Sequence, residues 1–464
     1  MKVLNYLWIS LFAGICFTAD AQQIAPFKKG DRVVFVGNSI THGGRYHQDI
    51  WLYYMTRFPD MPITIMNGGI GGEIGEQMYK RLETDVYAKK PTVITLTFGM
   101  NDTGYFEFLG SDSAKKSKEK LERSYQALLQ MDASFKKHPE IKKILIAGSP
   151  YDETSKFGNN NLFPGKANAM LKVADFQEAV AKKSGWGFVD FTRPMTAINL
   201  SEQAKDSTYT LIGNDRIHPG VDGHLVMAYL FLKAQGFENK KVADFTVNAA
   251  TSKAESQVNC SITNIQSKDG TLKFDYLAKA LPYPVDTIPT GEWGAMQRRE
   301  SDALKVVPFT KEMNEEMLRI NGLTGSKYSI EIDGQKIGEW SGKELKEGIN
   351  LAEARKTPQY EQAMAIKKLN EERWQIERRF RDYAWMEYDF LMDKRLLMKD
   401  DLATLDTIYA HLNEGFVRGN LDNYLKARYP EVRQGWQNQM DVIVGQIYQI
   451  NKPKKHTFYI RIIK

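Results

Sequence analysis

Short apolar runs alternate with longer amphipathic stretches over the first half of the chain, from residue 31 to about residue 236. The runs have the length of strands buried on both faces, and the stretches between them repeat apolar positions at helical spacing. This alternation predicts a flavodoxin-like, three-layer α/β/α domain with a five-stranded parallel sheet, because right-handed crossovers leave few other topologies. The predicted strands are 32–36, 63–66, 93–98, 144–147 and 187–191, and the predicted helices are 47–58, 73–87, 114–136, 166–184 and 221–235.

Beyond Phe237 the pattern changes to short alternating runs. Asp333-Gly334 stands between two such runs, 328–332 and 335–337, and this dipeptide favours a tight hairpin. Thr357-Pro358 has the form of an N-cap followed by proline in a first helical turn, and apolar residues then recur at helical spacing among many charges. We therefore predict an α/β domain over 22–245, a small β-rich domain over 246–350, and a mostly helical region over 351–464 that ends in a strand near 456–463.

The composition and charge of the chain indicate which classes of binding partner to expect. Hydrophobic residues make up 42% and charged residues 26% of the chain, and the formal charge of +6 is spread without a long basic run. A nucleic-acid partner is therefore not expected. The oligomeric state is left open.

The first 21 residues have the three parts of a secretory signal. Lys2 supplies the positive start, residues 4–17 the apolar segment, and Ala19-Asp20-Ala21 the small-x-small cleavage site. A membrane anchor is the alternative, but the apolar stretch is shorter than the roughly 20 residues that span a bilayer. We expect cleavage after Ala21 and a secreted or periplasmic protein without stable membrane insertion. Cleavage removes Cys16 and leaves Cys260 as the single cysteine, so no internal disulfide is expected.

Ser39 is a candidate nucleophile. It lies in Gly37-Asn38-Ser39-Ile40, directly after the first predicted strand, and the carboxyl edge of a parallel sheet is where open α/β folds hold their ligands. The alternative is that Asn38 and Ser39 only end a strand or cap a helix.

Two further segments follow strands and carry groups that suit a developing oxyanion. Residues 67–72 contain four glycines, which allow backbone N–H groups to point into a concavity, although a plain turn is the alternative. A dinucleotide fingerprint is disfavoured because the cluster follows the second strand and lacks an acidic partner. Asn101, in Gly99-Met100-Asn101-Asp102, follows the third strand, and its amide can donate to the same oxyanion, although Asn101 and Asp102 could instead form a capping turn.

Asp215-Arg216-Ile217-His218-Pro219 precedes the last predicted helix of the α/β domain. Acid and imidazole three residues apart fall on one side of a turn, so Asp215 can orient His218, which can then take the Ser39 proton. A cap or surface histidine is the alternative.

These four segments together resemble the motif blocks of the GDSL-type hydrolases, also called the SGNH family. The resemblance covers roughly residues 30–236. It implies that Ser39 is the nucleophile, that Asp215 and His218 complete the triad, and that the oxyanion hole consists of the Ser39 N–H, Gly72 and Asn101. Gly71 is the competing choice for the glycine. The family usually has aspartate before the serine, where this chain has Asn38.

Residues near the predicted rim are candidates for contact with substrate. They are Asn38, His42, Tyr151 and Glu153, with His47 on the loop after Ser39 as a further rim residue. His224, on the last helix, is interpreted as structural. No two histidines stand at metal-ligand spacing with a third ligand, so neither a metal nor another cofactor is expected.

We therefore expect a secreted serine esterase that forms an acyl-enzyme on Ser39 and acts on O-acyl, and specifically O-acetyl, esters of carbohydrates. One alternative is a lipid esterase or lysophospholipase, which requires a long apolar groove. The other is a non-catalytic glycan-binding protein on the same fold.

Overall fold

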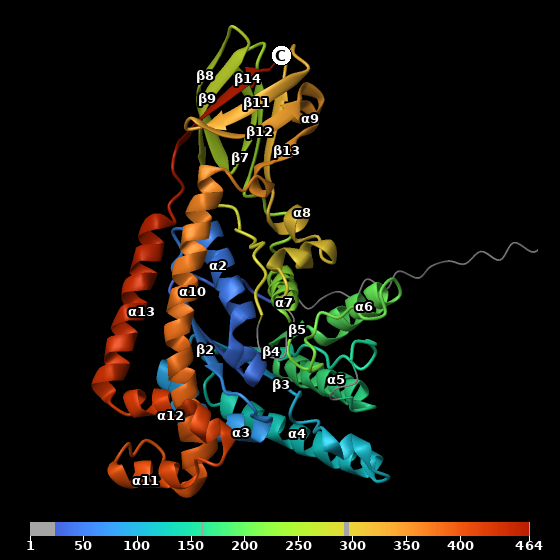
Figure 1. Ribbon diagram of the computed structural model, residues 1–464, viewed down its shortest axis with the longest axis vertical. Helices are drawn as coiled ribbons and strands as arrows, with labels where there is room; N and C mark the ends of the chain where they lie inside the picture. The colour runs from blue at the N-terminus through green and yellow to red at the C-terminus, as the bar shows by residue number, and fades with distance from the viewer. Residues whose placement is uncertain (1–23, 159–161, 292–296, 464) are drawn as a thin grey trace, which may run out of the picture.

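The computed structural model describes residues 24–158, 162–291 and 297–463 (Figure 1). The predicted signal segment and its cleavage site lie outside the described residues. Within the described part of the chain, no helix has both the length and the hydrophobicity needed to cross a bilayer.

A five-stranded, all-parallel sheet forms the centre of the first domain, with strand order β2-β1-β3-β4-β5. This order is the flavodoxin-like one, and it confirms the predicted fold class. Alternate residues of β1 point to opposite faces: Val33 and Phe35 join one core, and Val34 and Val36 the other. The strands are β1 Arg32–Gly37, β2 Thr64–Gly69, β3 Val93–Phe98, β4 Lys142–Ala147 and β5 Gly187–Asp190.

Helices cover both faces of this sheet (Figure 1). Helices α2 (Arg45–Arg57) and α7 (Val221–Ala234) pack together on one face. On the other face lie α3 (Gly75–Lys80), α4 (Ser113–Phe135) and most of α5 (Lys166–Ser184). Two short helices were not predicted, α1 (Ser39–Gly43) and α6 (Thr192–Gln203).

The predicted helix over 73–87 is broken after α3. Arg81 is fully buried, and its guanidinium donates to the carboxylates of Glu73 and Asp85 and to the Gly68 carbonyl. The chain widens to a π-type turn over Leu82–Val86 directly after this arginine. An apolar-periodicity pattern does not anticipate a buried ion cluster of this kind, because it counts arginine as a surface residue.

The β-rich region consists of two sheets, ordered β13-β10-β6-β7 and β12-β11-β14-β9-β8, around a shared core. Asp333 and Gly334 both have positive φ, 49° and 84°, and join β11 to β12 in the predicted hairpin. The strands are β6 Ala243–Asn248, β7 Lys253–Val258, β8 Cys260–Lys268, β9 Thr271–Ala278, β10 Glu316–Asn321, β11 Lys327–Ile332, β12 Gln335–Ser341, β13 Ile349–Asn350 and β14 His456–Ile462, with α9 at Gly342–Glu347.

The three regions are interleaved along the chain. The boundary predicted between 245 and 246 falls inside β6, and β14, from the far C-terminal end, pairs with β9 and β11. The connection between β9 and β10 carries α8 (Phe309–Met313) and packs its apolar side chains into the core of the α/β domain. The β-rich region is therefore attached to the α/β domain by a shared core.

The helical region consists of α10 (Pro358–Trp385), α11 (Leu402–Ala410), α12 (Gly415–Ala427) and α13 (Pro430–Ile450). The N-cap of α10 is Thr357, whose hydroxyl accepts the Tyr360 N–H, with proline in the first turn as predicted. Helix α10 runs alongside the α/β domain and packs against α2, α13 and the edge strand β2 (Figure 1).

Candidate active site

Ser39 is the first residue of α1, immediately beyond β1. The Asn38 side chain caps this helix by accepting the Ile40 N–H at 3.1 Å. The capping interpretation therefore holds for Asn38. The Ser39 side chain faces a neighbouring imidazole instead, and the residue is only 9% exposed.

Three side chains from distant parts of the sequence form a hydrogen-bonded series. The Ser39 Oγ lies 2.8 Å from His218 Nε2, and His218 Nδ1 lies 2.5 Å from Asp215 Oδ2. With Nδ1–H donating to the carboxylate, Nε2 carries no proton and can accept that of the serine.

Hydrogen bonds within the turn 215–218 stabilise the segment that carries the acid and the base. Asp215 Oδ1 accepts the backbone N–H groups of Ile217 and His218. Burial opposes the charge of Asp215, but the hydrogen bonds from His218 and Ile217 outweigh it and keep the Asp215 pKa below its ordinary value. Arg216, with φ of +65°, reaches away from the site and donates to four backbone carbonyls of the loop 152–158. The turn is therefore anchored to the loop after β4.

Gly72 and Asn101 line the same cavity as Ser39 and His218. Gly72 has a φ of +87°, which only glycine adopts without strain. The Gly71 N–H already donates to His42 Nδ1 at 3.1 Å, so the geometry favours Gly72 over Gly71 as an oxyanion donor. Asn101 Nδ2 donates one hydrogen to the Glu73 carbonyl at 2.9 Å, which leaves its second hydrogen for another acceptor.

The cavity in front of these groups has a volume of about 610 Å³ and two walls. The wall from the α/β domain carries the series just described, together with His42 and Tyr105. The opposite wall comes from the helical region: the end of α10, the turn after it, and the start of α12. Its residues are Asp382, Trp385, Asp389, Gly415, Phe416, Gly419 and Asn420.

Known protein families match both of the regions of the chain that form the cavity walls. Residues 35–226 match the model of the GDSL-like lipase/acylhydrolase family, and residues 364–452 match the diltiazem deacetylase C-terminal helical domain. The solved structure of a gut microbial diltiazem-metabolizing enzyme is 45% identical, covers 96% of this chain and 100% of its own, and superposes with a TM-score of 0.93. The chain belongs to the GDSL-like lipase/acylhydrolase family. The family predicted from the four motif blocks is thereby confirmed.

A second relative of this GDSL-family esterase is the acetylxylan esterase of Geobacillus stearothermophilus. It is 26% identical over 224 residues, which cover 45% of this chain and 95% of that protein. This relative matches less than half of the chain, whereas the diltiazem-metabolizing enzyme matches nearly all of it, the helical region included.

The aromatic and acidic residues of the helical wall of the GDSL esterase were not predicted from sequence. The rings of Trp385 and Phe416 lie 5.6 Å apart between centroids, and Phe416 is 70% exposed. Burial, with the nearby Asp393 charge, raises the pKa of Asp389 to about 6. These residues lie more than 340 positions beyond Ser39, and no local motif connects them to it.

Lys166 is a second residue that motif reasoning missed. It is fully buried, and its ammonium donates to the carbonyls of Met100 and Gly104 and to the Thr103 hydroxyl, at 2.6 to 2.7 Å. Burial lowers its pKa to about 7. These bonds hold the turn on which Asn101 stands.

Several predicted rim residues lie elsewhere. Of the five predicted rim residues, only His42 is part of the cavity lining. Tyr151 is buried and accepts the Phe163 N–H through its hydroxyl, and Glu153 accepts the N–H groups of Gly165 and Ala167 at the start of α5. Neither side chain is part of the cavity lining: Glu153 caps the start of α5, and Tyr151 bonds the segment that leads into that helix.

The other two predicted rim residues are also absent from the lining of this cavity. Asn38 is committed to the cap of α1, and His47 is wholly buried, with Nε2 hydrogen-bonded to the Thr41 carbonyl. His224 is buried and stacks on Tyr46, in agreement with the structural interpretation.

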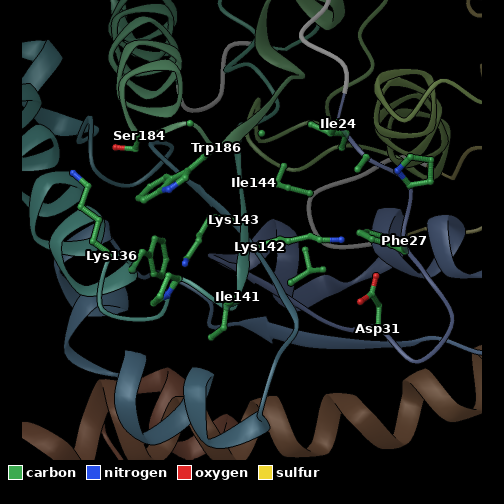
Figure 2. A pocket seen from close by; sticks show the side chains of 17 residues that line it. Ile24, Phe27, Asp31, Lys136, Ile141, Lys142, Lys143, Ile144, Ser184 and Trp186 are labelled. Atoms are coloured by element: carbon green, nitrogen blue, oxygen red, sulfur yellow. The ribbon is translucent and has the colours of Figure 1, made fainter.

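A cavity of about 600 Å³ lies at the opposite edge of the sheet, and Figure 2 shows it. It is lined by residues at the amino ends of the strands, such as Lys142 and Ile144, and by Trp186 and Ile24. Ligands of open α/β sheets bind at the carboxyl ends. The candidate active site is therefore the cavity in front of Ser39.

Proposed function

We propose that this GDSL esterase is an O-acetylesterase that acts through a covalent acyl-enzyme on Ser39. The observation that carries the proposal is the series Ser39–His218–Asp215, which opens into the cavity shared by two regions of the chain.

In the first half of the reaction, the Ser39 Oγ attacks the ester carbonyl carbon as its proton passes to His218 Nε2. The carbonyl oxygen becomes an oxyanion that accepts from the N–H groups of Ser39 and Gly72 and from the Asn101 amide. The C–O bond to the alcohol then breaks, and His218 returns the proton to the departing oxygen. In the second half, water takes the place of serine, and acetate and free Ser39 are released.

The choice of acetyl as the acyl group is supported by the two relatives together. One is an acetylxylan esterase, and the helical region matches a domain named for a diltiazem deacetylase. The leaving groups of those two relatives differ, whereas the acetyl group is common to both.

For the leaving group we propose a carbohydrate. The faces of Trp385 and Phe416 offer an apolar platform for the C–H face of a sugar ring, and the carboxylates of Asp382 and Asp389 can accept from its hydroxyls. Asn420 adds a side chain that can both donate and accept.

A second candidate leaving group is an aromatic alcohol that carries a cation. Two carboxylates stand beside two aromatic rings in this wall, and aromatic faces and carboxylates both attract cations. The alignment with the relative that metabolizes diltiazem covers 96% of this chain, the helical region included, whereas the alignment with the acetylxylan esterase covers 45% of it.

The test is acetate release from acetylated xylo-oligosaccharides, acetylated aryl-alkyl amines, and p-nitrophenyl esters of two to twelve carbons. We expect the two-carbon ester to be the best nitrophenyl substrate and Ser39→Ala to be inactive on every compound. Equal rates for wild type and Ser39→Ala would refute the mechanism. Preference for long chains would replace the acetylesterase by a lipid esterase, and binding of glycans without turnover would favour the glycan-binding alternative.

We also propose that the enzyme works after export, on the strength of the three-part segment that ends at Ala21. N-terminal sequencing of protein recovered from the periplasm or the medium should begin at Gln22. Recovery of uncleaved protein from the cytoplasm alone would contradict this.

A further inference from the structure

Side chains on one face of α10 form hydrogen bonds with the backbone of residues 67–71, directly before the proposed oxyanion donor Gly72. A Glu377 carboxylate oxygen accepts the Asn67 N–H at 2.9 Å, Arg381 Nε donates to the Gly69 carbonyl at 3.0 Å, and Trp385 Nε1 donates to the Gly71 carbonyl at 3.2 Å. The three side chains are four residues apart on one helix, and their backbone partners are two residues apart along the neighbouring segment.

This match of spacings has a geometric basis. Four residues of an α-helix rise about 6 Å, and two residues of a strand span about 6.7 Å. Strand β2 is at the edge of its sheet, so its outward backbone groups, at every second residue, have no strand partner. Helix α10 pairs them with side chains, and its last turn continues the pairing past the end of β2 to Gly71.

The contact at Gly71 bears directly on the oxyanion hole. The Gly71 carbonyl and the Gly72 N–H belong to the same peptide unit, which is planar and trans, so the two groups point in opposite directions. A hydrogen bond from Trp385 to the carbonyl therefore sets the direction of the Gly72 N–H. A bond at the carbonyl also polarises the peptide and strengthens its N–H as a donor. Glycine at both positions leaves this peptide free to rotate without such a contact.

The preceding peptide is held by a second pair of residues. The Gly71 N–H donates to His42 Nδ1, so the neutral ring carries its proton on Nε2, which lies 3.1 Å from Asp382 Oδ1. Asp382 comes from α10, one turn before Trp385. Helix α10 thus fixes Gly71 at its carbonyl directly and at its N–H through His42.

We propose that Trp385, with His42 and Asp382, positions the oxyanion hole, so that the helical region is a working part of the catalytic centre. The proposal rests on the proposed function, because it assumes that the Gly72 N–H stabilises the oxyanion formed from Ser39. These three side chains are positioning residues and need not touch the reacting atoms.

The decisive variant is Trp385→Phe, which keeps an aromatic ring in the cavity wall and removes the N–H donor. Full loss of one oxyanion donor costs about 10²- to 10³-fold in kcat, and a misdirected donor should cost about tenfold. We expect this loss in kcat with KM changed less than about threefold, because an uncharged ground-state carbonyl gains little from the oxyanion donors. The inhibition constant of a trifluoromethyl ketone, which forms an oxyanion on Ser39, should rise by the same factor as kcat falls.

The matched control is Trp374→Phe, the same substitution on the same helix. The indole nitrogen of Trp374 has no hydrogen-bond partner within the described parts of the chain, and the residue is outside the cavity lining. Its kcat should equal that of wild type. If Trp385→Phe also keeps wild-type kcat and ketone affinity, the positioning role is overturned.

A second pair of variants tests the contact at the Gly71 N–H. Asparagine at position 42 places an oxygen near the site of Nδ1, whereas glutamine reaches toward the site of Nε2. We therefore expect His42→Asn to retain several-fold more kcat than His42→Gln. Equal kcat values, or the reverse order, would overturn the role of His42 even if Trp385→Phe folds poorly.

Ser39→Ala separates this proposal from the function on which it rests. Activity that persists in Ser39→Ala removes the proposed function. Loss of activity in Ser39→Ala, combined with wild-type kinetics in Trp385→Phe and the two His42 variants, overturns the positioning role alone.

Discussion

Replacement of Asn101 by alanine isolates the side-chain donor of the proposed oxyanion hole. The Asn101 amide has two hydrogens, and the structure commits one of them to the Glu73 carbonyl. The amide oxygen is oriented by the Tyr105 hydroxyl, which donates to it at 2.7 Å. The second amide hydrogen is therefore held in a defined direction before the substrate arrives.

The expected loss follows from this preorganisation. One such donor is worth about 3 to 4 kcal/mol in acyl transfer, which corresponds to about 10²- to 10³-fold in kcat. The folded state also loses two hydrogen bonds at a partly buried position, which should lower the free energy of unfolding by about 1 to 3 kcal/mol. The catalytic loss should thus greatly exceed what a small loss of stability explains.

The assay is steady-state hydrolysis of p-nitrophenyl acetate, whose leaving group departs as an anion, so that the rate reports oxyanion formation and not protonation by His218. Urea unfolding measures the stability of each variant. Tyr105→Phe is the matched control, because it removes the orienting hydroxyl and keeps the Asn101 donor, and its kcat should fall less than about tenfold. If Asn101→Ala stays within fivefold of wild type in kcat, or if its loss lies wholly in KM, the assignment of Asn101 to the oxyanion hole is refuted.

Three further changes test other parts of the site. Asp215→Asn should lower kcat by about 10⁴-fold, since an amide in place of the carboxylate favours the wrong His218 tautomer; a loss under tenfold in steady-state assays would contradict the role of Asp215. Because burial raises the Asp389 pKa to about 6, this carboxyl is neutral below that pH and charged above it, so KM for a cationic acetyl ester should fall as pH rises through 6. Asp389→Asn should abolish that trend, and a trend that survives in the variant would exclude Asp389 as its source. Phe416→Ala should raise KM for acetylated oligosaccharides several-fold with kcat nearly unchanged, and the KM of Phe416→Leu should lie between those of wild type and Phe416→Ala. Unchanged KM in both variants would remove Phe416 from the substrate site.

The α/β domain could be predicted because its signals are local. Each strand of a parallel sheet is buried on both faces and therefore reads as a short apolar run, and the helices between them carry their own apolar stripe. Ser39, Asn101 and His218 each follow a strand or precede a helix, and the topology of a parallel sheet brings such positions to one edge. The hydroxyl, imidazole and carboxylate that these motifs singled out lie in hydrogen-bonded series in the folded protein.

Side-chain direction in loops could not be predicted in the same way. Tyr151 and Glu153 follow β4 and were expected at the rim, yet both turn inward to bond backbone groups near α5. A loop has no periodicity from which to infer facing, and its direction is set by the backbone groups that need partners.

The second wall of the cavity is formed by residues that lie more than 340 positions beyond Ser39 in the sequence. Trp385 and Phe416 lie on helices whose sequence pattern reports an apolar stripe but not the surface against which it packs. Helix α10 lies along the unpaired edge of β2, and backbone groups of this edge and of the segment just beyond it match side chains four residues apart on the helix. Such complementarity between two distant elements is a property of their three-dimensional arrangement, so neither segment carries a sign of it when considered alone.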